Sequence, residues 1–484
     1  MQFLVIQRIV GLLLMIFSST MLPPMVVSVI YLDGSFVSFF YAFAVTLITG
    51  IALWLPVKNQ RQELRLRDGF LVVVMFWTVL GLFGAIPFIL TEHPHLTLTD
   101  AVFESLSGLT TTGATVLQGI DQLPKSILYY RQQLQWLGGM GIIVLAVAIM
   151  PMLGIGGMQL YRAETPGPIK DSKLTPRITE TAKALWYIYL TLTIACGVGY
   201  WLAGMDAFDA LAHSFATVAI GGFSTHDASM GYFIDKPMVE AVAIVFMFIS
   251  GINFALHFTA WRTRNLRNYL FDSEFKTYLA LMLLACIVVT SYLYYQGLFA
   301  THRETLIHSI FQVVSIGTTT GFTTHQYHLW PGFLPVMLLF TSFIGACAGS
   351  TGGGMKVIRF LLLLRQGMRE IIRVIHPNAV IPIKIGGKAM PPRVVESVWG
   401  FFSAYVAAFV IIMLIMMMTG LDQITAFSAV AATMNNLGPG LGDVALNYAS
   451  LESVAKWVLC FAMLLGRLEI FTLLVLLTPA FWRK

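Results

Sequence analysis

Long apolar stretches joined by short polar loops restrict the fold of this chain more than any other feature of its sequence. Crossing about 30 Å of hydrocarbon takes roughly 20 residues of α-helix, and these stretches are long enough. Of all residues, 57% are apolar and only 11% are charged, unlike a soluble domain. We therefore predict an integral protein of the lipid bilayer without a large soluble domain. The predicted spanning helices cover residues 3–32, 36–55, 69–90, 126–153, 184–202, 237–261, 277–298, 330–364, 395–418 and 454–477.

Basic residues are concentrated in alternate loops between these stretches. They gather at 58–67, 162–183, 262–276 and 365–393, whereas the intervening loops carry few. The positive-inside rule places the basic loops and both termini in the cytoplasm. Because the charges are dispersed among membrane loops rather than gathered on one domain, they do not indicate nucleic-acid binding. The four cysteines lie in apolar stretches without a CxxC pair, so neither a disulfide framework nor a zinc site is predicted.

Four intervals of the sequence repeat one another. Each holds a moderately apolar run that is too short to cross a bilayer and that ends in a glycine surrounded by Thr, Ser or Asn. These glycines are Gly113, Gly222, Gly321 and Gly438, and the spacing between them fits one unit of helix, half-helix and helix. Such a run indicates a re-entrant half-helix followed by a loop.

The repetition predicts an all-α polytopic membrane protein in which four helix–pore loop–helix units surround a central pore. Two further helices precede these units at the N-terminus. The predicted boundaries are 1–60 for the N-terminal helix pair, 61–165 for the first pore unit, 166–265 for the second, 266–375 for the third, with an intramembrane gating loop, and 376–484 for the fourth.

The four loops carry the groups that a dehydrated cation needs. Backbone carbonyls and threonine hydroxyls can replace the hydration shell where a loop lines a water-filled cavity. Glycine reaches backbone angles closed to other residues, so that successive carbonyls can point at one axis. Each half-helix would also direct its negative C-terminal end at the membrane centre. The predicted cation-binding residues are Thr111, Thr112, Gly113, Ile220, Gly221, Gly222, Thr319, Thr320, Gly321, Asn436, Leu437 and Gly438.

A glycine-rich run, 345–354, interrupts the apolar stretch after the third loop. So many glycines hold a regular helix poorly, and we predict a flexible loop that obstructs the pore and moves to gate it. The alternative is close helix packing through small residues. A phosphate-binding P-loop is not predicted, because Val357 rather than Ser or Thr follows Lys356 and no soluble strand precedes the run. The predicted gating residues are Gly345, Gly349, Ser350, Thr351, Gly352, Gly353, Gly354 and Arg467.

Charged residues in apolar surroundings need partners. Arg467 lies in the last apolar stretch, where an ionised side chain is expensive unless it is paired or hydrated. We expect it to contact carbonyls of the 345–354 loop and to hold a closed gate, and a tie to a carboxylate such as Glu469 is the alternative. Asp100 and Asp209 open their half-helices and are predicted as N-caps rather than as ion ligands.

Six short segments closely resemble the bacterial TrkH and TrkG potassium transport subunits of the Trk/Ktr/HKT superfamily, and the similarity covers essentially the whole chain. The segments are 110–115, 221–226, 318–323, 435–440, 163–168 and 466–471. The resemblance implies potassium uptake through a gated, cation-selective pore in the bacterial inner membrane, with the potassium ion as cargo and no covalent or nucleotide cofactor in this chain. It supports the gating role of the glycine-rich run.

The same resemblance implies a homodimer in which each protomer has its own pore. It also implies control by a cytoplasmic TrkA-type ring protein that binds NAD(H) or ATP. One departure concerns the loops, which share a single glycine with one another where a potassium-channel filter reads TVGYG. Looser discrimination against sodium would follow from fewer well-formed sites.

Two other classes of function compete with a gated pore. A proton- or sodium-coupled secondary transporter with broader selectivity would use glycine breaks as a midplane binding site. It would show two inverted repeats, whereas four parallel units suit a central pore. A membrane enzyme would need a clustered acid, base or metal set, and the sequence offers none, so an enzyme is not predicted.

Overall fold

The computed structural model describes residues 1–60, 65–139 and 178–483. Helices dominate these ranges, and their strands are β1 (Lys384–Ile385) and β2 (Lys388–Ala389), which form a short antiparallel hairpin. Six of the described helices are long and apolar enough to cross a membrane, or eight if each of two bent pairs counts as one span. The chain is therefore an all-α, multi-pass membrane protein, as predicted.

Some predicted features lie outside the described residues. These are the part of the predicted 126–153 helix beyond Gly139, most of the basic loop at 162–183, the segment 163–168 and the boundary between the first two units.

The N-terminal helix pair is α1 (Phe3–Ser18), continued by η1 (Ser19–Met21) and α2 (Leu22–Tyr31), and α3 (Phe36–Trp54), which ends in η2 (Leu55–Val57). Glycines let α1 and α3 approach closely. A Cβ atom added to Gly11 would lie 2.8 Å from the carbonyl oxygen of Gly50, and one added to Gly50 would lie 2.9 Å from that of Gly11. Small residues at such crossings favour tight packing between membrane helices.

Each of the four units contains one helix of 12 to 16 residues that leads into its glycine loop, and we call these four the short helices. The first unit contains α4 (Leu66–Gly84), α5 (Ile86–Leu90), α6 (Leu98–Leu109), η3 (Ile120–Gln122) and α7 (Lys125–Gly139). The second contains α11 (Ile178–Leu202), α12 (Ala207–Ala219), η6 (Ser229–Phe233), α13 (Pro237–Ser250) and α14 (Phe254–Thr263).

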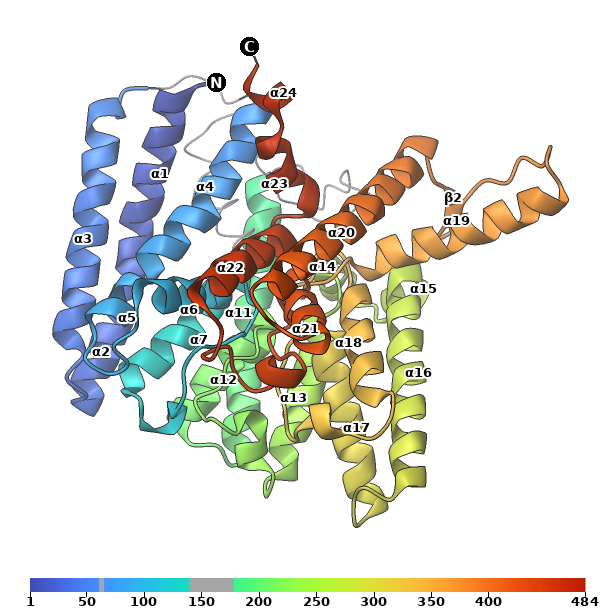
Figure 1. Cartoon of the computed structure of the whole chain (residues 1–484), viewed down its shortest axis with the longest axis horizontal. Coiled ribbons are helices and arrows are strands. Elements are labelled where there is room, and N and C mark those ends of the chain that lie inside the picture. Colours follow the sequence, from blue (N-terminus) through green and yellow to red (C-terminus); the bar gives the residue numbers. More distant parts are fainter. Residues whose placement is uncertain (61–64, 140–177, 484) are drawn as a thin grey trace.

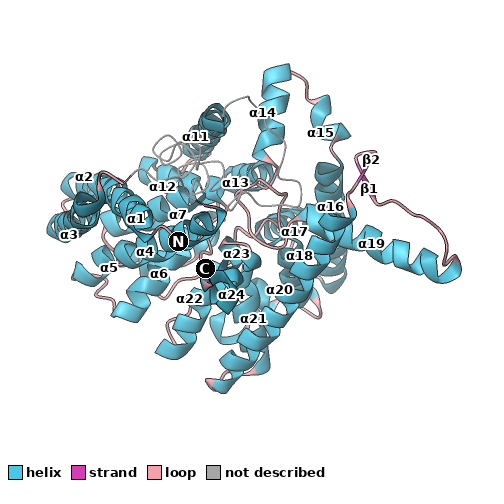
Figure 2. Ribbon diagram, turned by 90° about the horizontal axis from the view of Figure 1, so that it is seen from above, coloured by secondary structure: helices cyan, strands magenta, loops and turns pink. Residues whose placement is uncertain are grey.

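The other two units follow the same order. The third contains α15 (Arg267–Phe271), α16 (Ser273–Gln296), α17 (His302–Gly317), η7 (Tyr327–Leu329), α18 (Leu334–Ile344) and α19 (Val357–Ile375). The fourth contains α20 (Pro392–Met418), α21 (Gln423–Met434), η8 (Gly442–Val444), α22 (Ser453–Arg467), α23 (Ile470–Leu477) and α24 (Pro479–Trp482). The short helices α6, α12, α17 and α21 are distributed around the middle of the molecule (Figure 2).

Three predicted spanning helices are broken. The predicted 237–261 helix bends by 93° between α13 and α14, and the predicted 454–477 helix bends by 119° between α22 and α23. The first break arises because the side chain of Asn253 accepts a hydrogen bond from the backbone of Ala255 at 2.8 Å and starts a new helix. At the second, Glu469 has a left-handed backbone with φ of 54°. The predicted 330–364 helix is interrupted between α18 and α19, where the glycine-rich run had indicated a loop.

The short helices begin one turn earlier than expected. Asp100 and Asp209 are not N-caps, which corrects the prediction made from their position. The caps are Thr97, which accepts a hydrogen bond from the backbone N–H of Asp100 at 3.3 Å, and Asp206, which accepts one from that of Asp209 at 2.6 Å. A cap followed three residues later by an acidic residue is the usual signature of a helix start.

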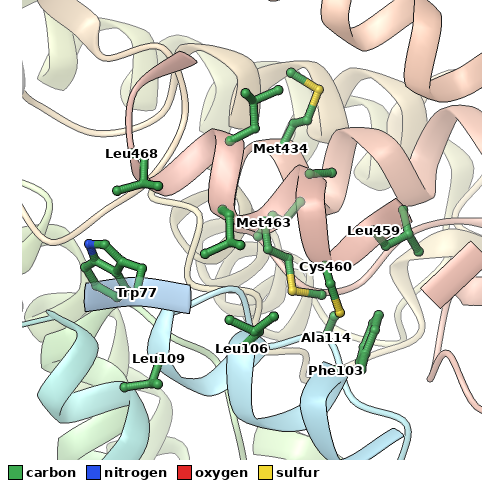
Figure 3. Packing of buried hydrophobic residues seen from close by; sticks show 14 of the residues in the cluster. Trp77, Phe103, Leu106, Leu109, Ala114, Met434, Leu459, Cys460, Met463 and Leu468 are labelled. Carbon is green, nitrogen blue, oxygen red and sulfur yellow. The ribbon is translucent and has the colours of Figure 1, made fainter. Parts of the chain in front are cut away.

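The fourth unit packs against the first, so that the last unit of the chain adjoins the first one. Leu106 and Ala114 of the first unit lie against Met463 and Cys460 of α22 (Figure 3). Viewed from the side, both termini lie at the same end of the molecule, and α19 projects from its body (Figure 1).

Candidate functional site

The loops after the four short helices share one backbone conformation. In each, a left-handed residue is followed by one residue of ordinary φ and then by a left-handed glycine. The left-handed φ angles are 56° and 80° at Thr111 and Gly113, 55° and 77° at Ile220 and Gly222, 70° and 84° at Thr319 and Gly321, and 52° and 100° at Asn436 and Gly438. Such angles are rare outside glycine, so their recurrence in four different sequences marks a common architecture.

The same four glycines bring the loops into one closed ring. Each glycine abuts the carbonyl oxygen of the residue just before the glycine of the next unit, and the fourth unit returns to the first. A Cβ atom added to Gly113 would lie 2.1 Å from Gly221 O, and one added to Gly222 would lie 2.0 Å from Thr320 O. One added to Gly321 would lie 2.0 Å from Leu437 O, and one added to Gly438 would lie 2.7 Å from Thr112 O. We call the twelve predicted cation-binding residues of the four loops, together with their backbone carbonyls, the carbonyl ring.

Side chains around the carbonyl ring are tied to one another. The hydroxyls of Thr110 and Thr112 lie 2.7 Å apart, and the side-chain amide of Asn436 donates to Thr112 Oγ1 at 2.9 Å. Thr318 and Thr320 repeat the 2.7 Å hydroxyl contact in the third unit. Because the C-termini of the short helices end at this ring, their partial negative charges add to the field of the carbonyls.

A glutamine side chain packs against the second loop, which reads Ile-Gly-Gly where the first and third loops read Thr-Thr-Gly. The amide of Gln135, on α7, fills the space of the side chain that Gly221 lacks, since a Cβ there would lie 2.4 Å from its Cδ. This amide donates to Gly221 O at 2.5 Å and accepts from the backbone of Phe223 at 3.0 Å. Gln135 was not among the predicted site residues, although a polar residue in a membrane helix was the signal that could have indicated it.

A buried ion pair that was not predicted from the sequence links the first and second loops. Arg131 Nε lies 2.8 Å from Glu104 Oε1, with 1% and 0% of the two side chains exposed. Arg131 also donates to Ser224 O at 3.0 Å, and Glu104 accepts from the backbone of Val116 at 3.0 Å. Arg131 lies inside the predicted 126–153 helix, and a glutamate in a half-helix together with an arginine in the next helix is the signal that could have predicted the pair.

Replacing Arg131 by Met is expected to lower the free energy of unfolding by about 3–5 kcal/mol, because it leaves the buried Glu104 carboxylate without its charged partner. The double variant Glu104→Gln/Arg131→Met should recover part of that loss. Thermal unfolding in detergent measures both, with Lys58→Met on an exposed loop as the control. A double variant no more stable than the single one would show that the pair is not a unit.

The glycine-rich segment between α18 and α19 passes along the inner ends of three short helices. Gly353 N donates to Thr319 Oγ1 at 2.7 Å, and Thr351 Oγ1 donates to Val218 O at 2.9 Å. Gly354 N donates to the carbonyl of Asn435 at 3.1 Å. The segment therefore reaches the second, third and fourth units at the C-terminal ends of their short helices, next to the carbonyl ring.

Arg467 connects this segment with the ring. Its guanidinium donates to Thr351 O at 3.3 Å, to Thr111 Oγ1 at 3.2 Å and to Gly138 O at 2.6 Å. The predicted contact with a carbonyl of the loop is present. Glu469, the alternative partner, forms an ion pair with Arg359 at 2.7 Å.

A small, partly open cavity lies beside the glycine-rich segment. Its lining includes Asn436 of the carbonyl ring and the charged residues Lys356, Arg359, Arg467 and Glu469. Lys356 donates to a carbonyl of the segment, that of Gly352. Three basic side chains against one carboxylate make this cavity unfavourable for a cation, because charges interact strongly where little water is present.

Comparisons with known proteins agree with this architecture. The family model described as "TrkH: Cation transport protein" matches residues 36–484. The Trk system potassium uptake protein TrkH of Vibrio parahaemolyticus is 59% identical over 100% of both chains. That of Escherichia coli K12 is 57% identical over 100% of both, and the TrkG protein of the same organism is 43% identical over 99% of both. The crystal structure of the potassium transporter TrkH from Vibrio parahaemolyticus superimposes with a TM-score of 0.91 at 57% identity and covers 100% of both chains.

Proposed function

Because the chain belongs to the TrkH family of cation transport proteins, we propose that it takes up potassium ions through the carbonyl ring. The single observation that carries this proposal is the closure of the ring, in which the glycine of each unit abuts a carbonyl of the next. Backbone carbonyls from four loops can replace the water around a monovalent cation without any ionised ligand. Relatives of high identity are named potassium uptake proteins, which supports potassium as the transported ion.

The glycine-rich segment is proposed as the gate of this pathway. It contacts the inner ends of three short helices, and Arg467 bonds both to its Thr351 carbonyl and to Thr111 in the ring. In this position the segment blocks the path, and the basic side chains of the adjacent cavity add an electrostatic barrier. Opening requires the segment to leave its partners, which glycine allows because it has wide backbone freedom.

Potassium flux into proteoliposomes tests this function. Rubidium-86 and sodium-22 uptake are measured side by side, with and without a pH gradient. Passive uptake that favours rubidium and proceeds without a proton or sodium gradient supports a pore. Uptake that requires a proton or sodium gradient would instead support the alternative, a coupled secondary transporter with broader selectivity.

The assembly that the proposal implies is a homodimer in the bacterial inner membrane, with its termini and basic loops in the cytoplasm. Both termini lie at one end of the molecule (Figure 1), as an orientation with both ends in the cytoplasm requires. A TrkA-type ring protein that binds NAD(H) or ATP is the proposed cytoplasmic partner. The exposed basic residues of α19, which projects from the body, are available to it.

Neutralising Arg365, Arg369 and Arg373 together as glutamines is expected to weaken capture of a TrkA-type protein by about tenfold, a loss of about 1.4 kcal/mol. Charge complementarity at such a surface steers and orients a partner. Pull-down with purified protein measures the effect. Arg303→Gln, in the first turn of α17 and on the side predicted to face outside, is the matched control. Equal capture by the triple variant would exclude α19 from the docking surface.

A further inference from the structure

The segment that follows the second loop of the ring carries a histidine between two aspartates. His226 Nδ1 lies 2.5 Å from Asp121 Oδ1, and its Nε2 lies 3.0 Å from Asp209 Oδ2. The imidazole also stacks on Tyr232, with ring centroids 3.6 Å apart and an angle of 5° between the planes. Asp209 belongs to the first turn of α12, so the histidine lies on the side of the ring remote from the gate segment.

Both ring nitrogens of His226 thus face carboxylate oxygens. A neutral imidazole has one N–H donor, whereas an ionised carboxylate can only accept. Both contacts are therefore hydrogen bonds only when both nitrogens carry protons and the ring is an imidazolium. Charge-assisted hydrogen bonds of this kind are among the strong ones in proteins.

The two aspartates come from different units. Asp121 lies in η3, in the segment that follows Gly113, and Asp209 lies on the short helix that leads to Gly222. Further contacts tie the same chain segments, because Thr225 donates to Asp209 at 2.8 Å and Asp227 N donates to Asp121 at 3.2 Å. His226 consequently joins the first and second units just beyond the ring.

We propose that His226 is a positioning residue for ion selection, which in its doubly protonated form holds the segments after Gly113 and Gly222 together and releases them when the external solution becomes alkaline. This inference rests on the proposed function and deepens it, because it assigns to the outer mouth a control by external protons. The His226 side chain is 10% exposed and that of Asp121 is 45% exposed, so protons reach the site from solution.

The charges around His226 favour its protonated form. Burial opposes protonation, but the hydrogen bonds and negative charges of Asp209 and Asp121 outweigh it and raise the pKa of His226. Asp227 lies next to Asp121, because the backbone N–H of each donates a hydrogen bond to the carboxylate of the other. From α12, the ring of His213 faces His226 at 6.4 Å and bonds to Ser224 Oγ and Asp209 O, and from α7 the Arg131 guanidinium reaches the carbonyl of Ser224.

The direction of the pH dependence follows from this shift. A group whose pKa is raised in the folded protein contributes stability fully below its unfolded pKa, about 6.5 for histidine. That contribution is lost as the pH rises through the higher folded value. The link between the two units should therefore weaken above about pH 6.5.

The third unit provides a matched control. His325 follows Gly321 by the same spacing as His226 follows Gly222, yet its neighbour at 4.3 Å is the ring of His308 rather than a carboxylate. Within the described ranges, no carboxylate lies within 4.0 Å of a His325 nitrogen. His325→Gln thus changes an equivalent histidine without breaking a charge-assisted link.

Rubidium and sodium flux in proteoliposomes tests the inference when the external pH is varied at constant internal pH. We expect the preference of the unchanged protein for rubidium over sodium to fall at least about threefold as external pH rises. Complete loss of a charge-assisted hydrogen bond changes an equilibrium constant by about tenfold, and only part of the bond is lost here. His226→Gln should show the lower preference at every pH, and His325→Gln should behave as the unchanged protein. A flat profile in the unchanged protein, or the same slope in His226→Gln, would overturn the proposal.

Thermal unfolding in detergent separates this inference from the proposed function. The unfolding midpoint of the unchanged protein should drop with rising pH more steeply than that of His226→Gln, whether or not ions pass. Identical pH dependence of the two midpoints would exclude the protonated link. Asp121→Asn, which removes the negative charge beside Nδ1 but keeps an amide oxygen that can accept there, should give a slope between those of the unchanged protein and His226→Gln.

Discussion

Replacing Gly113 or Gly321 by Ser is expected to reduce the preference for potassium over sodium by about tenfold or more, equivalent to about 1.4 kcal/mol between the two ions. The added Cβ would lie 2.1 Å from Gly221 O or 2.0 Å from Leu437 O, closer than any real contact. The neighbouring carbonyl must therefore move, and the left-handed φ angles of 80° and 84° make the new residue strained as well.

The effect should be graded around the ring. At Gly438 the corresponding distance is 2.7 Å, so Gly438→Ser should disturb selection less than the other two. Gly297→Ser is the control, because a Cβ there meets no atom within 4 Å although its φ of 63° is also left-handed. Uptake of potassium and sodium by cells without other potassium systems measures the preference, and immunoblots measure the protein. Unchanged preference at normal protein levels in both Gly113→Ser and Gly321→Ser would remove these loops from the selection of ions.

Removing the guanidinium of Arg467 is expected to raise ion flux by about tenfold in the absence of any cytoplasmic partner. Its bonds to Thr351 O and Thr111 Oγ1 fasten the glycine-rich segment against the ring. A hydrogen bond from a charged group contributes about 1.5–3 kcal/mol, and a shift of that size moves a closed state toward an open one by tenfold or more. Single-channel or liposome-flux recordings of Arg467→Ala measure it.

Two further variants define what the arginine does. Partial deletion of 345–354 should also raise flux, and combining it with Arg467→Ala should add little, because both changes remove the same interaction. Arg467→Lys keeps the charge but loses the planar fork of donors, so an intermediate flux is expected. Unaltered or reduced flux in well-folded Arg467→Ala and deletion variants would leave the segment as packing and the arginine as a structural charge.

The ring was predictable because its information is local and repeated. A glycine preceded by a short apolar run occurs four times in register, and the left-handed φ angles at Gly113, Gly222, Gly321 and Gly438 are the conformation that glycine was expected to supply. The contact of Arg467 with the glycine-rich segment followed from the expense of an unpaired charge in the membrane. Both features follow from local sequence, whatever path the chain takes in space.

The features that were missed depend on contacts between distant residues. Arg131 meets Glu104 within the first unit but reaches Ser224 only after the first and second units pack together, and Gln135 of the first unit fills the space of the side chain that Gly221 of the second lacks. The sharp bend after α22 places Gly466 against the carbonyl of Met434, 2.2 Å from where a Cβ would lie. An apolar pattern predicts that a helix is buried but not where tertiary packing breaks it.

The central claim, that the carbonyl ring holds the transported ion, is tested most directly by locating a heavy analogue of potassium. Crystals grown with thallium or rubidium salts give anomalous difference density for the ion. The account predicts a peak on the axis of the ring, in contact with the carbonyl oxygens of Thr112, Gly221, Thr320 and Leu437, and its loss in sodium alone. Strong peaks elsewhere in the chain, with none at the ring, would contradict it.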